Sequence, residues 1–519
     1  MEHQNRTNDR APMTKKKPPA PPLDAAALAA ARILCAHDAP ARRGQYVLYW
    51  LRGLRRAEDN LAFDHAVTRA NALGLPLVVY ESLDVRYPYA SARMHTFVLE
   101  SAIGRRAAVE SRGAAYALHL PRTADEAREG RVVSKLAARA ALVVTDWQPP
   151  AGPLGAFFRR TAAKIGADAN VRVECVDDTV GVPMSLFADK HEIGARTIRP
   201  KVHKVLDASL VASDEPTVIS QRIRSFDWPF EPVDPTADSI AKLVASCAID
   251  HSVAPVTATR GTRKEARSRL ERFVAARLRS YDSARNDMGG VGSSELSAYL
   301  HFGVLSGRSV ARAARAAAAP IEARESFVEE LIVRRALAFN HVMTTPCEGD
   351  GAHHRYAGAV PEWARKTLGA HAADARSTHT FKDWESARTT DPLWNAAQRE
   401  LLRDGVIHPY ARMLWGKVAL TLAPSPEVAF EWLVALNDKW ALDGRDPNTY
   451  TNIAWCFGLH DHPYPERAVF GTVRCMTSKS ARTKWDTRAY ERRVLTPSSP
   501  EASALRSAQA AGDGPTLPA

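Results

Sequence analysis

Short apolar runs rich in strand-forming residues alternate with helical segments along the first two fifths of the chain. The apolar runs, of which the first reads QYVLYWL, are residues 45–51, 75–81, 141–146 and 171–177. Ala- and Arg-rich segments with helical periodicity, 58–73 and 93–112, lie between the first three. This alternation is typical of a parallel sheet covered by helices on both faces. We therefore predict an α/β doubly wound parallel-sheet domain over residues 41–200.

The carboxyl ends of the strands are the expected ligand-binding edge of such a sheet. The first strand leads into WLRGLRR, in which Gly53 stands alone. Folds that bind a dinucleotide at this edge have a GxGxxG loop there, because glycines let the backbone approach the phosphates. We therefore do not expect a dinucleotide in that position.

The second half of the chain is helical almost throughout. Apolar residues recur with helical spacing in the segments 263–281, 294–301, 306–319, 325–343, 391–404, 409–423 and 426–440. We predict an all-α C-terminal domain over residues 261–492. A proline-containing linker, 201–260, with one short helix at 237–248, is expected to join it to the sheet. The basic segment 1–40 and the Pro-, Ser- and Ala-rich segment 493–519 are predicted to be disordered tails.

The chain has 519 residues, a formal net charge of +12 and a pI of about 9.5. Such a charge favours a polyanionic partner, although an Arg-rich composition from a GC-rich genome explains it equally well. The sequence contains no apolar run of about 18 residues and no apolar segment typical of a secretory signal. Its six cysteines form no CxxC pair, which favours reduced thiols and no metal site. We expect a cytoplasmic protein, associated with the nucleoid if it is bacterial.

The stretch 434–455, VALNDKWALDGRDPNTYTNIAW, concentrates polar side chains and two tryptophans between apolar helical segments. Its carboxylates, amides and arginine could hold a heterocyclic ring beside tryptophans able to stack or to pass electrons. A polar loop between helices is the simpler interpretation. It explains the Asp and Asn residues but not their company with both tryptophans.

Two further segments carry clustered polar residues. Ser293, Ser294 and Ser297 lie at a predicted helix start in GSSELSAYLHFGVLS. Hydroxyls and free backbone N–H groups there form an anion site, with ordinary N-capping as the alternative. Glu329 and Glu330 lie side by side on an otherwise apolar helix, SFVEELIVRR, so one of them must point inward. We favour Glu330, and a salt-bridged surface helix is the alternative.

These segments resemble the photolyase–cryptochrome family, and in particular its class II photolyases. GSSELSAYLHFGVLS is similar to the family's phosphate-binding segment SxLSPYLxFGxLS, and SFVEELIVRR is similar to its EELxxRREL motif. WNAAQ followed by RMLWGK matches the class II pattern, as do VLYWLRGLRRAEDN near the N-terminus and GLHDHPYPERAVFG near the C-terminus. The resemblance covers residues 45–490. It implies the family's fold and an FAD cofactor that is reduced and anionic in its active form.

The resemblance assigns roles to individual residues. The positions implied to bind FAD are Tyr281, Ser293, Ser294, Leu296, Ser297, Asn437 and Asp443. Asn437 matches an asparagine beside flavin N5, and Arg412 and Asp443 match a charge pair beside the ring system. Together with Glu329 and Glu330, these three form the implied catalytic set. The implied contacts with a flipped lesion or the surrounding duplex are Arg285, Met413, Trp455 and His462.

Trp415 and Trp394 match tryptophans that relay electrons to the flavin in class II photolyases, although burial in the core is their simpler interpretation. The family's outer tryptophan falls seven residues after Trp415, where this chain has Leu422. The relay is thus truncated, and electrons need another exit. The candidates for that exit are Tyr410, Trp384 and Trp440.

The resemblance implies light-driven repair of cyclobutane pyrimidine dimers in double-stranded DNA by an electron from photoexcited, reduced FAD. An antenna chromophore could bind at the strand ends, but the sequence does not identify one. We expect a monomer without an obligate protein partner, a membrane or a metal ion. A cryptochrome-like flavin photoreceptor without repair activity is the main alternative, and a DNA-binding flavoprotein that has lost its photoactivity is a third.

Overall fold

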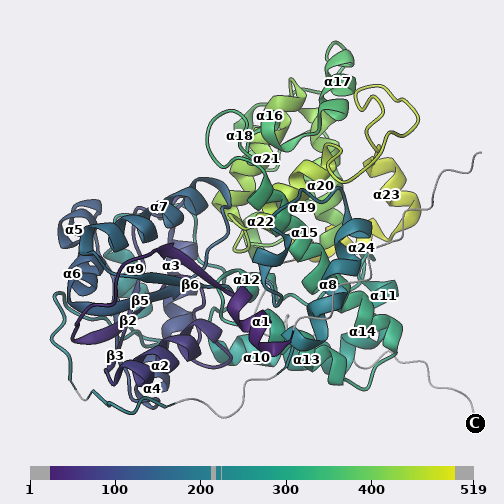
Figure 1. Ribbon diagram of the computed structural model, residues 1–519. Coiled ribbons are helices and arrows are strands. Elements are labelled where there is room, and N and C mark those ends of the chain that lie inside the picture. The colour runs from purple at the N-terminus through teal and green to yellow at the C-terminus, as the bar shows by residue number, and fades with distance from the viewer. Residues whose placement is uncertain (1–23, 212–217, 224, 497–519) are drawn as a thin grey trace, which may run out of the picture.

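A six-stranded sheet forms the core of the N-terminal part of the computed structural model, which describes residues 24–211, 218–223 and 225–496 (Figure 1). The strands are β1 Ile33–His37, β2 Tyr46–Leu51, β3 Leu77–Ser82, β4 Ala115–His119, β5 Ala140–Asp146 and β6 Val173–Val176. Their order is β1-β6-β5-β2-β3-β4. Neighbouring strands run parallel except β1 and β6. The predicted doubly wound sheet is confirmed.

The four predicted strands form the middle of the sheet, and the two edge strands escaped prediction. Every residue of β2 is buried, as expected for a strand covered on both faces. The sequence of β4, AYALH, has too much alanine to stand out by strand propensity, and β1, ILCAH, is partly exposed along its length. Both edges therefore lack the apolar, β-branched pattern that marked the others.

Helices cover both sides of the sheet. They are α2 Leu61–Leu73, α3 Ala92–Ala102, α4 Arg105–Glu110, α5 Ala124–Gly130, α6 Val132–Arg139 and α7 Gly152–Ala169. In Figure 1, α2 and α4 lie below the sheet and α7 lies above it. The predicted helical segments 58–73 and 93–112 correspond to α2 and to α3 with α4.

The structure differs from the predicted disordered tail 1–40 over residues 24–37. Helix α1, Ala25–Ala31, is a run of good helix formers whose N-cap, Asp24, accepts a hydrogen bond from the backbone N–H of Ala27. Strand β1 follows at once and pairs with β6. Residues 1–23 and 497–519, which hold the rest of both predicted tails, lie outside the described residues.

The C-terminal half is helical, as predicted. Its longer helices are α8 Ala195–Ser209, α10 Arg263–Arg272, α13 Gly307–Ala316, α14 Ile321–Val328, α15 Arg335–Thr344, α17 Glu362–Ala370, α19 Pro392–Asp404, α20 Pro409–Leu422, α21 Pro426–Trp440, α22 Pro447–Cys456 and α24 Thr487–Leu495. Shorter ones are α9 Ile240–Ala245, α11 Tyr281–Ala284, α12 Ser297–His301, α16 Tyr356–Ala359, α18 Phe381–Glu385 and α23 Ser478–Lys484. Two π-helical turns, η2 Phe273–Arg277 and η4 Glu329–Arg334, interrupt the helical runs.

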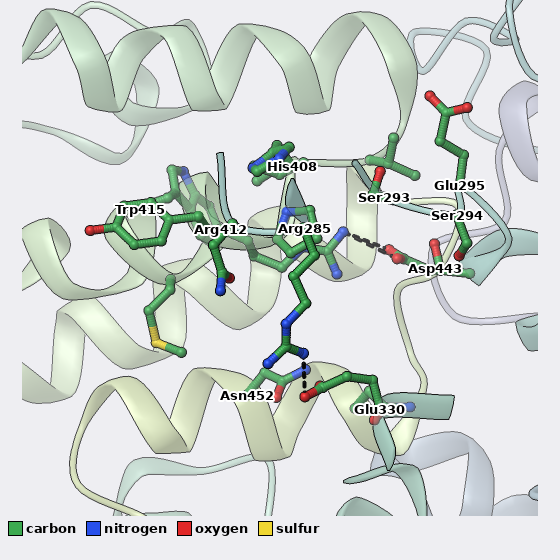
Figure 2. A pocket seen from close by; sticks show the side chains of 18 of the residues that line it. Arg285, Ser293, Ser294, Glu295, Glu330, His408, Arg412, Trp415, Asp443 and Asn452 are labelled. Carbon is green, nitrogen blue, oxygen red and sulfur yellow. Dashed lines mark hydrogen bonds and ion pairs between the residues drawn. The ribbon is translucent and has the colours of Figure 1, made fainter. Parts of the chain in front are cut away.

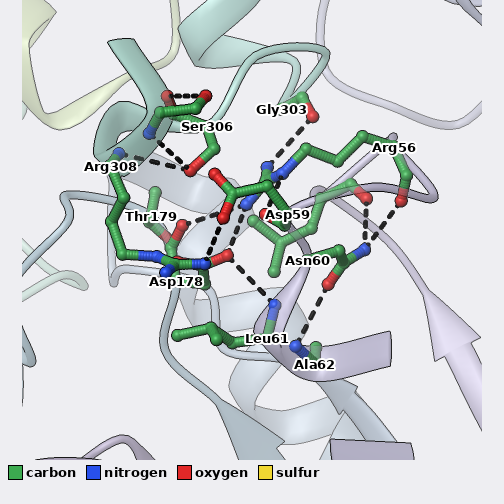
Figure 3. Close-up of polar contacts among 12 residues, drawn as sticks. Arg56, Asp59, Asn60, Leu61, Ala62, Asp178, Thr179, Gly303, Ser306 and Arg308 are labelled. Carbon is green, nitrogen blue, oxygen red and sulfur yellow. Dashed lines mark hydrogen bonds and ion pairs between the residues drawn. The ribbon is translucent and has the colours of Figure 1, made fainter. Parts of the chain in front are cut away.

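Asp178, just after β6, connects the sheet to the helical half (Figure 3). Its carboxylate accepts hydrogen bonds from Nη2 of Arg56 at 2.5 Å and from Nε of Arg308 in α13 at 2.9 Å. Arg308 also reaches Oδ1 of Asp59 at 2.8 Å. The Asp178 side chain is fully buried, and its ion pairs with these guanidinium groups offset the free-energy cost of removing the carboxylate from water. The predicted linker begins inside α8, which packs against α15 and η4.

None of the helices described in the structure combines the length and the hydrophobicity needed to cross a lipid bilayer.

Candidate functional site

A cavity of about 790 Å³ lies among the helices of the C-terminal half (Figure 2). The predicted site residues that line it are Tyr281, Arg285, Ser293, Ser294, Leu296, Ser297, Glu330, Arg412, Met413, Trp415, Asn437, Asp443 and Trp455. Residues far apart in the sequence thus meet in one place. The predicted site residues that are not in its lining are Glu329, Trp394 and His462.

The π-helical turn η4 gives the two adjacent glutamates different surroundings. Glu330 lines the cavity and forms an ion pair with Arg285 (Figure 2). Glu329 accepts hydrogen bonds from Nε and Nη2 of Arg199, in α8, at 3.0 and 2.7 Å. The expectation that Glu330 is the inward residue agrees with this geometry. Glu329, the other glutamate of the expected catalytic set, is not in the lining of the cavity and is paired with Arg199 instead.

The serine segment borders the cavity just ahead of α12, which begins only at Ser297. The N-cap residue of that helix is Leu296, and no side chain caps it. N-capping therefore does not explain these serines. Glu295 among them has a φ of +59°, a left-handed conformation that costs free energy in a residue with a side chain and is concentrated at functional sites.

Arg412 and Asp443 form the expected charge pair (Figure 2). Nη2 of Arg412 donates to both carboxylate oxygens of Asp443, at 3.0 and 3.1 Å. Nε of Arg412 is buried without a partner. Asn437, which is only 2% exposed, donates from its side-chain amide to Oγ1 of Thr449 at 2.9 Å. An amide, a carboxylate and a guanidinium with an unused N–H suit a polar heterocycle.

The other two carboxylates of the stretch 434–455 stabilise its local structure. Asp438 accepts hydrogen bonds from the backbone N–H of Arg445 at 2.8 Å and from the hydroxyl of Tyr450 at 3.0 Å, and burial raises the pKa of its carboxyl to about 6. Asp446 caps α22 and contacts a ring nitrogen of His301 at 3.1 Å. Asp438, in α21, thus has a structural role, whereas Asp443 lines the cavity.

Trp415 lies at the cavity wall and Trp394 lies directly behind it. The two rings are stacked, with centroids 6.0 Å apart and planes 17° apart. Nε1 of Trp415 donates to Oε1 of Gln398 at 3.1 Å, and Nε1 of Trp394 donates to the backbone carbonyl of Trp415 at 2.9 Å. Leu422 is buried and contributes only an aliphatic side chain. The predicted pair is therefore in contact and rigidly oriented.

The residues expected at DNA divide between the cavity and the surface. Trp455 and Met413 line the cavity, and the guanidinium of Arg334 lies 5.2 Å from the centroid of the Trp455 ring. His462 lies on an exposed loop, with 74% of its side chain accessible, and its ring stacks on Tyr464. An exposed histidine is available to a duplex but not to a molecule inside the cavity.

A scan of known protein-family models finds no match to the chain. A deoxyribodipyrimidine photo-lyase of Methanothermobacter thermautotrophicus is 33% identical over 459 residues, which cover 88% of this chain and 96% of that protein. The chain belongs to the photolyase/cryptochrome family. A second member, the deoxyribodipyrimidine photo-lyase of Oryza sativa subsp. japonica, is 34% identical over 477 residues, covering 88% and 89% of the two chains.

Solved structures agree with membership of the photolyase/cryptochrome family at the level of the fold. The archaeal photolyase of Sulfolobus tokodaii, whose structure contains two FAD molecules, superimposes with a TM-score of 0.57 at 17% identity. The superposition covers 89% of this chain and 93% of that one. An N-terminal α/β domain followed by a helical half is therefore the photolyase/cryptochrome architecture here too.

The cavity of this photolyase/cryptochrome-family protein suits a large ligand with negative charge. Its volume lies in the range of cofactor sites, and more arginines and lysines than carboxylates line it. Both ring nitrogens of His408 and Nε of Arg335 are buried there without partners. Burial lowers the pKa of His408 to about 4, so its ring is neutral at pH 7. Donors left unpaired beside a cavity are expected where a ligand completes the hydrogen bonding.

His408 and Asn452 are among the polar residues that line this cavity and that the prediction missed (Figure 2). His408 precedes the Pro409 that begins α20, so its sequence context is that of an ordinary helix start. Asn452 lies inside α22, a helix hidden in what reads as a polar loop. Among the residues with a described placement, no cluster of three or more His, Cys, Asp or Glu is arranged to bind a metal ion.

Proposed function

We propose that the protein is a deoxyribodipyrimidine photo-lyase, which uses light to split cyclobutane pyrimidine dimers in DNA. One observation carries the proposal: the residues needed for the cofactor and those needed for the lesion line the same cavity. Asn437, Arg412 and Asp443 belong to the cofactor set, and Glu330 and Trp455 belong to the lesion set. A photoreceptor without repair activity has no need of the second set.

FAD is the proposed cofactor, in its reduced, anionic form when the enzyme is active. The residues that would hold it are Tyr281, Ser293, Ser294, Leu296, Ser297, Arg412, Asn437 and Asp443, all of them in the lining. Reduced FAD supplies one electron to the lesion after absorbing near-UV or blue light. Hydroxyls of the serine segment would donate to its phosphates. The guanidinium of Arg412 would lie beside the negative charge of the ring system.

The lesion must leave the duplex to enter the cavity, and a damaged step lowers the cost of that flip. Glu330 is the carboxyl group available to hydrogen-bond the pyrimidines, once Arg285 yields its ion pair. Trp455 and Met413 offer apolar surfaces against which the dimer can pack. Basic residues around the cavity, such as Arg334, would contact the flanking phosphates and make binding weaken with salt.

Within the family, class II is the proposed branch. The pattern WNAAQ followed by RMLWGK supports it, and the two tryptophans of that pattern are in contact, Trp415 at the cavity wall and Trp394 behind it. The proposed partner is double-stranded DNA that contains pyrimidine dimers, met in the cytoplasm by a monomer without an obligate protein partner.

Binding to damaged DNA tests the proposal without light. Reduced, FAD-loaded protein is titrated in the dark with a duplex that contains one thymine dimer and with the same duplex undamaged. Tighter binding to the damaged duplex, falling with rising salt, is expected. Equal affinity for both duplexes would contradict a cavity built for the lesion.

A further inference from the structure

Behind Trp415 the indole contacts do not stop at Trp394. The Trp394 and Trp384 rings have centroids 5.0 Å apart, and the Trp384 and Trp432 rings have centroids 5.2 Å apart. With the 6.0 Å between Trp415 and Trp394, four indoles form an unbroken series of ring contacts. The series takes Trp432 from α21 and Trp384 from α18, and neither belongs to the tryptophan pair that the sequence motifs indicate.

Burial gives this series a direction. Trp415, Trp394 and Trp384 are at most 1% exposed, whereas Trp432 is only partly buried and lines a second cavity of about 330 Å³. A positive charge on a buried indole is destabilised by the loss of water, and water relieves that cost at Trp432. The indole N–H of Trp384 is buried without a partner, so no acceptor for its proton lies beside it. An oxidised state would therefore move outward and come to rest at Trp432.

We propose that Trp415, Trp394, Trp384 and Trp432, in this order, conduct the electrons that photoreduce the cofactor, with Trp384 and Trp432 replacing the outer tryptophan lost at Leu422. The inference rests on the proposed function, since it requires bound FAD. Tyr410 and Trp440, the other exits considered, have different neighbours. The Tyr410 ring contacts Trp485, and Trp440 donates its indole N–H to Glu385.

Each step of the proposed series moves one electron inward. Trp415 would give an electron to the photoexcited, oxidised cofactor and would be refilled in turn from Trp394, Trp384 and Trp432. The Trp432 radical cation then releases its indole proton to water. A dithiol in solution returns one hydrogen atom to this neutral radical, and after two such turns the dithiol has become its disulfide. Over two turns the dithiol thus supplies two electrons and two protons. Both electrons and one proton account for the reduced, anionic cofactor, and the other proton remains in water.

Photoreduction under continuous blue light, without oxygen and with dithiothreitol present, tests the proposal. Loss of the oxidised flavin absorption is followed in the wild type and in Trp432→Phe, Trp384→Phe and Trp440→Phe. We expect photoreduction several-fold slower in the first two variants and unchanged in Trp440→Phe, whose tryptophan is half-buried on the same helix. In Trp432→Phe and Trp384→Phe, the tryptophan radical seen by transient absorption should also be shorter-lived. The radical then stays on a buried tryptophan close to the cofactor, so the electron returns to it sooner.

Two controls separate this inference from the proposed function. Each variant is also reduced chemically and assayed for repair, which should equal the wild type because the series only refills the cofactor. If the chemically reduced wild-type protein repairs no dimers, the proposed function, rather than the tryptophan series, is contradicted. Trp384 is fully buried, so Trp384→Phe could fail to fold. Flavin content and thermal unfolding check whether this variant folds. If it does not fold, the inference is judged on Trp432→Phe. Wild-type photoreduction in Trp432→Phe, or slowing confined to Trp440→Phe, would overturn the inference.

Discussion

Glu330 and Arg285 form an ion pair within the cavity, so the carboxylate proposed to hold the lesion is already paired in the free protein. Replacing Glu330 by Gln removes the charge but keeps the size of the side chain. A hydrogen bond to a charged group contributes about 1.5–3 kcal/mol, which corresponds to about 10- to 100-fold in rate. We expect a fall of this size in repair by chemically reduced protein, with the flavin content unchanged.

Its neighbour provides the control for that experiment. Glu329→Gln changes an equivalent carboxylate one residue away, whose partner is Arg199 outside the cavity. Repair by Glu329→Gln should equal that of the wild type. An equal loss of repair in Glu329→Gln and Glu330→Gln would show that repair depends on the structure of the helix and not on the carboxylate that faces the cavity.

Asp443→Asn should weaken FAD binding. The substitution removes the negative partner of Arg412, whose guanidinium then lies beside the cavity without its two hydrogen-bonded carboxylate contacts. Measurement of the FAD dissociation constant by flavin fluorescence should show a loss of about tenfold, as for a charged hydrogen bond. Asp438→Asn, at the end of α21 and facing the second cavity, should retain FAD. A larger loss in Asp438→Asn than in Asp443→Asn would contradict the assignment.

Acid should weaken the connection between the sheet and the helical half. Burial alone would raise the pKa of the Asp178 carboxyl, but the guanidinium groups of Arg308, Arg56 and Arg32 lower it below its ordinary value of 3.8. Because the folded-state pKa lies below the unfolded one, the stabilisation is present above pH 3.8 and is lost as the pH falls through the folded value.

Asp178→Asn tests the same connection at neutral pH. It leaves Arg56 buried without its anion and Arg308 with Asp59 alone, and breaking a buried pair in this way costs about 3–5 kcal/mol. Urea unfolding at pH 7 should show a loss of this size. The variant should also lose less stability than the wild type as the pH falls below 3.8, and identical pH profiles would refute the role given to the carboxylate.

Arg52 occupies the carboxyl ends of the strands, where an antenna chromophore could bind. Its guanidinium donates to Oγ1 of Thr145 at 3.0 Å and to the carbonyls of Asp146 and Phe158 at 2.9 and 3.0 Å. It also lies over the ring of Trp50, at 4.6 Å from the centroid. We predict that the action spectrum of repair follows the absorption of reduced FAD alone. An additional band, from a second chromophore at these strand ends, would refute this.

Much of the fold could be predicted because burial on both faces leaves a plain apolar pattern in the central strands. Most residues of the expected site line one cavity, and they were chosen from long motifs that resemble those of the photolyase–cryptochrome family. Glu329 shows a limit: two adjacent carboxylates in one motif look equivalent until a partner such as Arg199, from a distant helix, is in place. A π-helical turn leaves no clear signal in the periodicity of the sequence.

The tryptophan series shows the second limit. Trp384 and Trp432 are 48 residues apart in numbering, and each reads as an ordinary core or surface aromatic. Only the packing of α18 and α21 against α19 brings them into line behind Trp394. Ring contacts between distant segments are a tertiary property, so the sequence offered Trp384 merely as one of three candidate exits.

Light-dependent repair is the most direct measurement of the central claim. Purified protein with chemically reduced FAD is mixed with an oligonucleotide that contains one thymine dimer, illuminated with blue light without oxygen, and followed by the return of thymine absorbance. We expect restored thymines in the light, none in the dark, and strongly reduced repair in Glu330→Gln. Flavin-loaded protein that restores no thymine under illumination would contradict it.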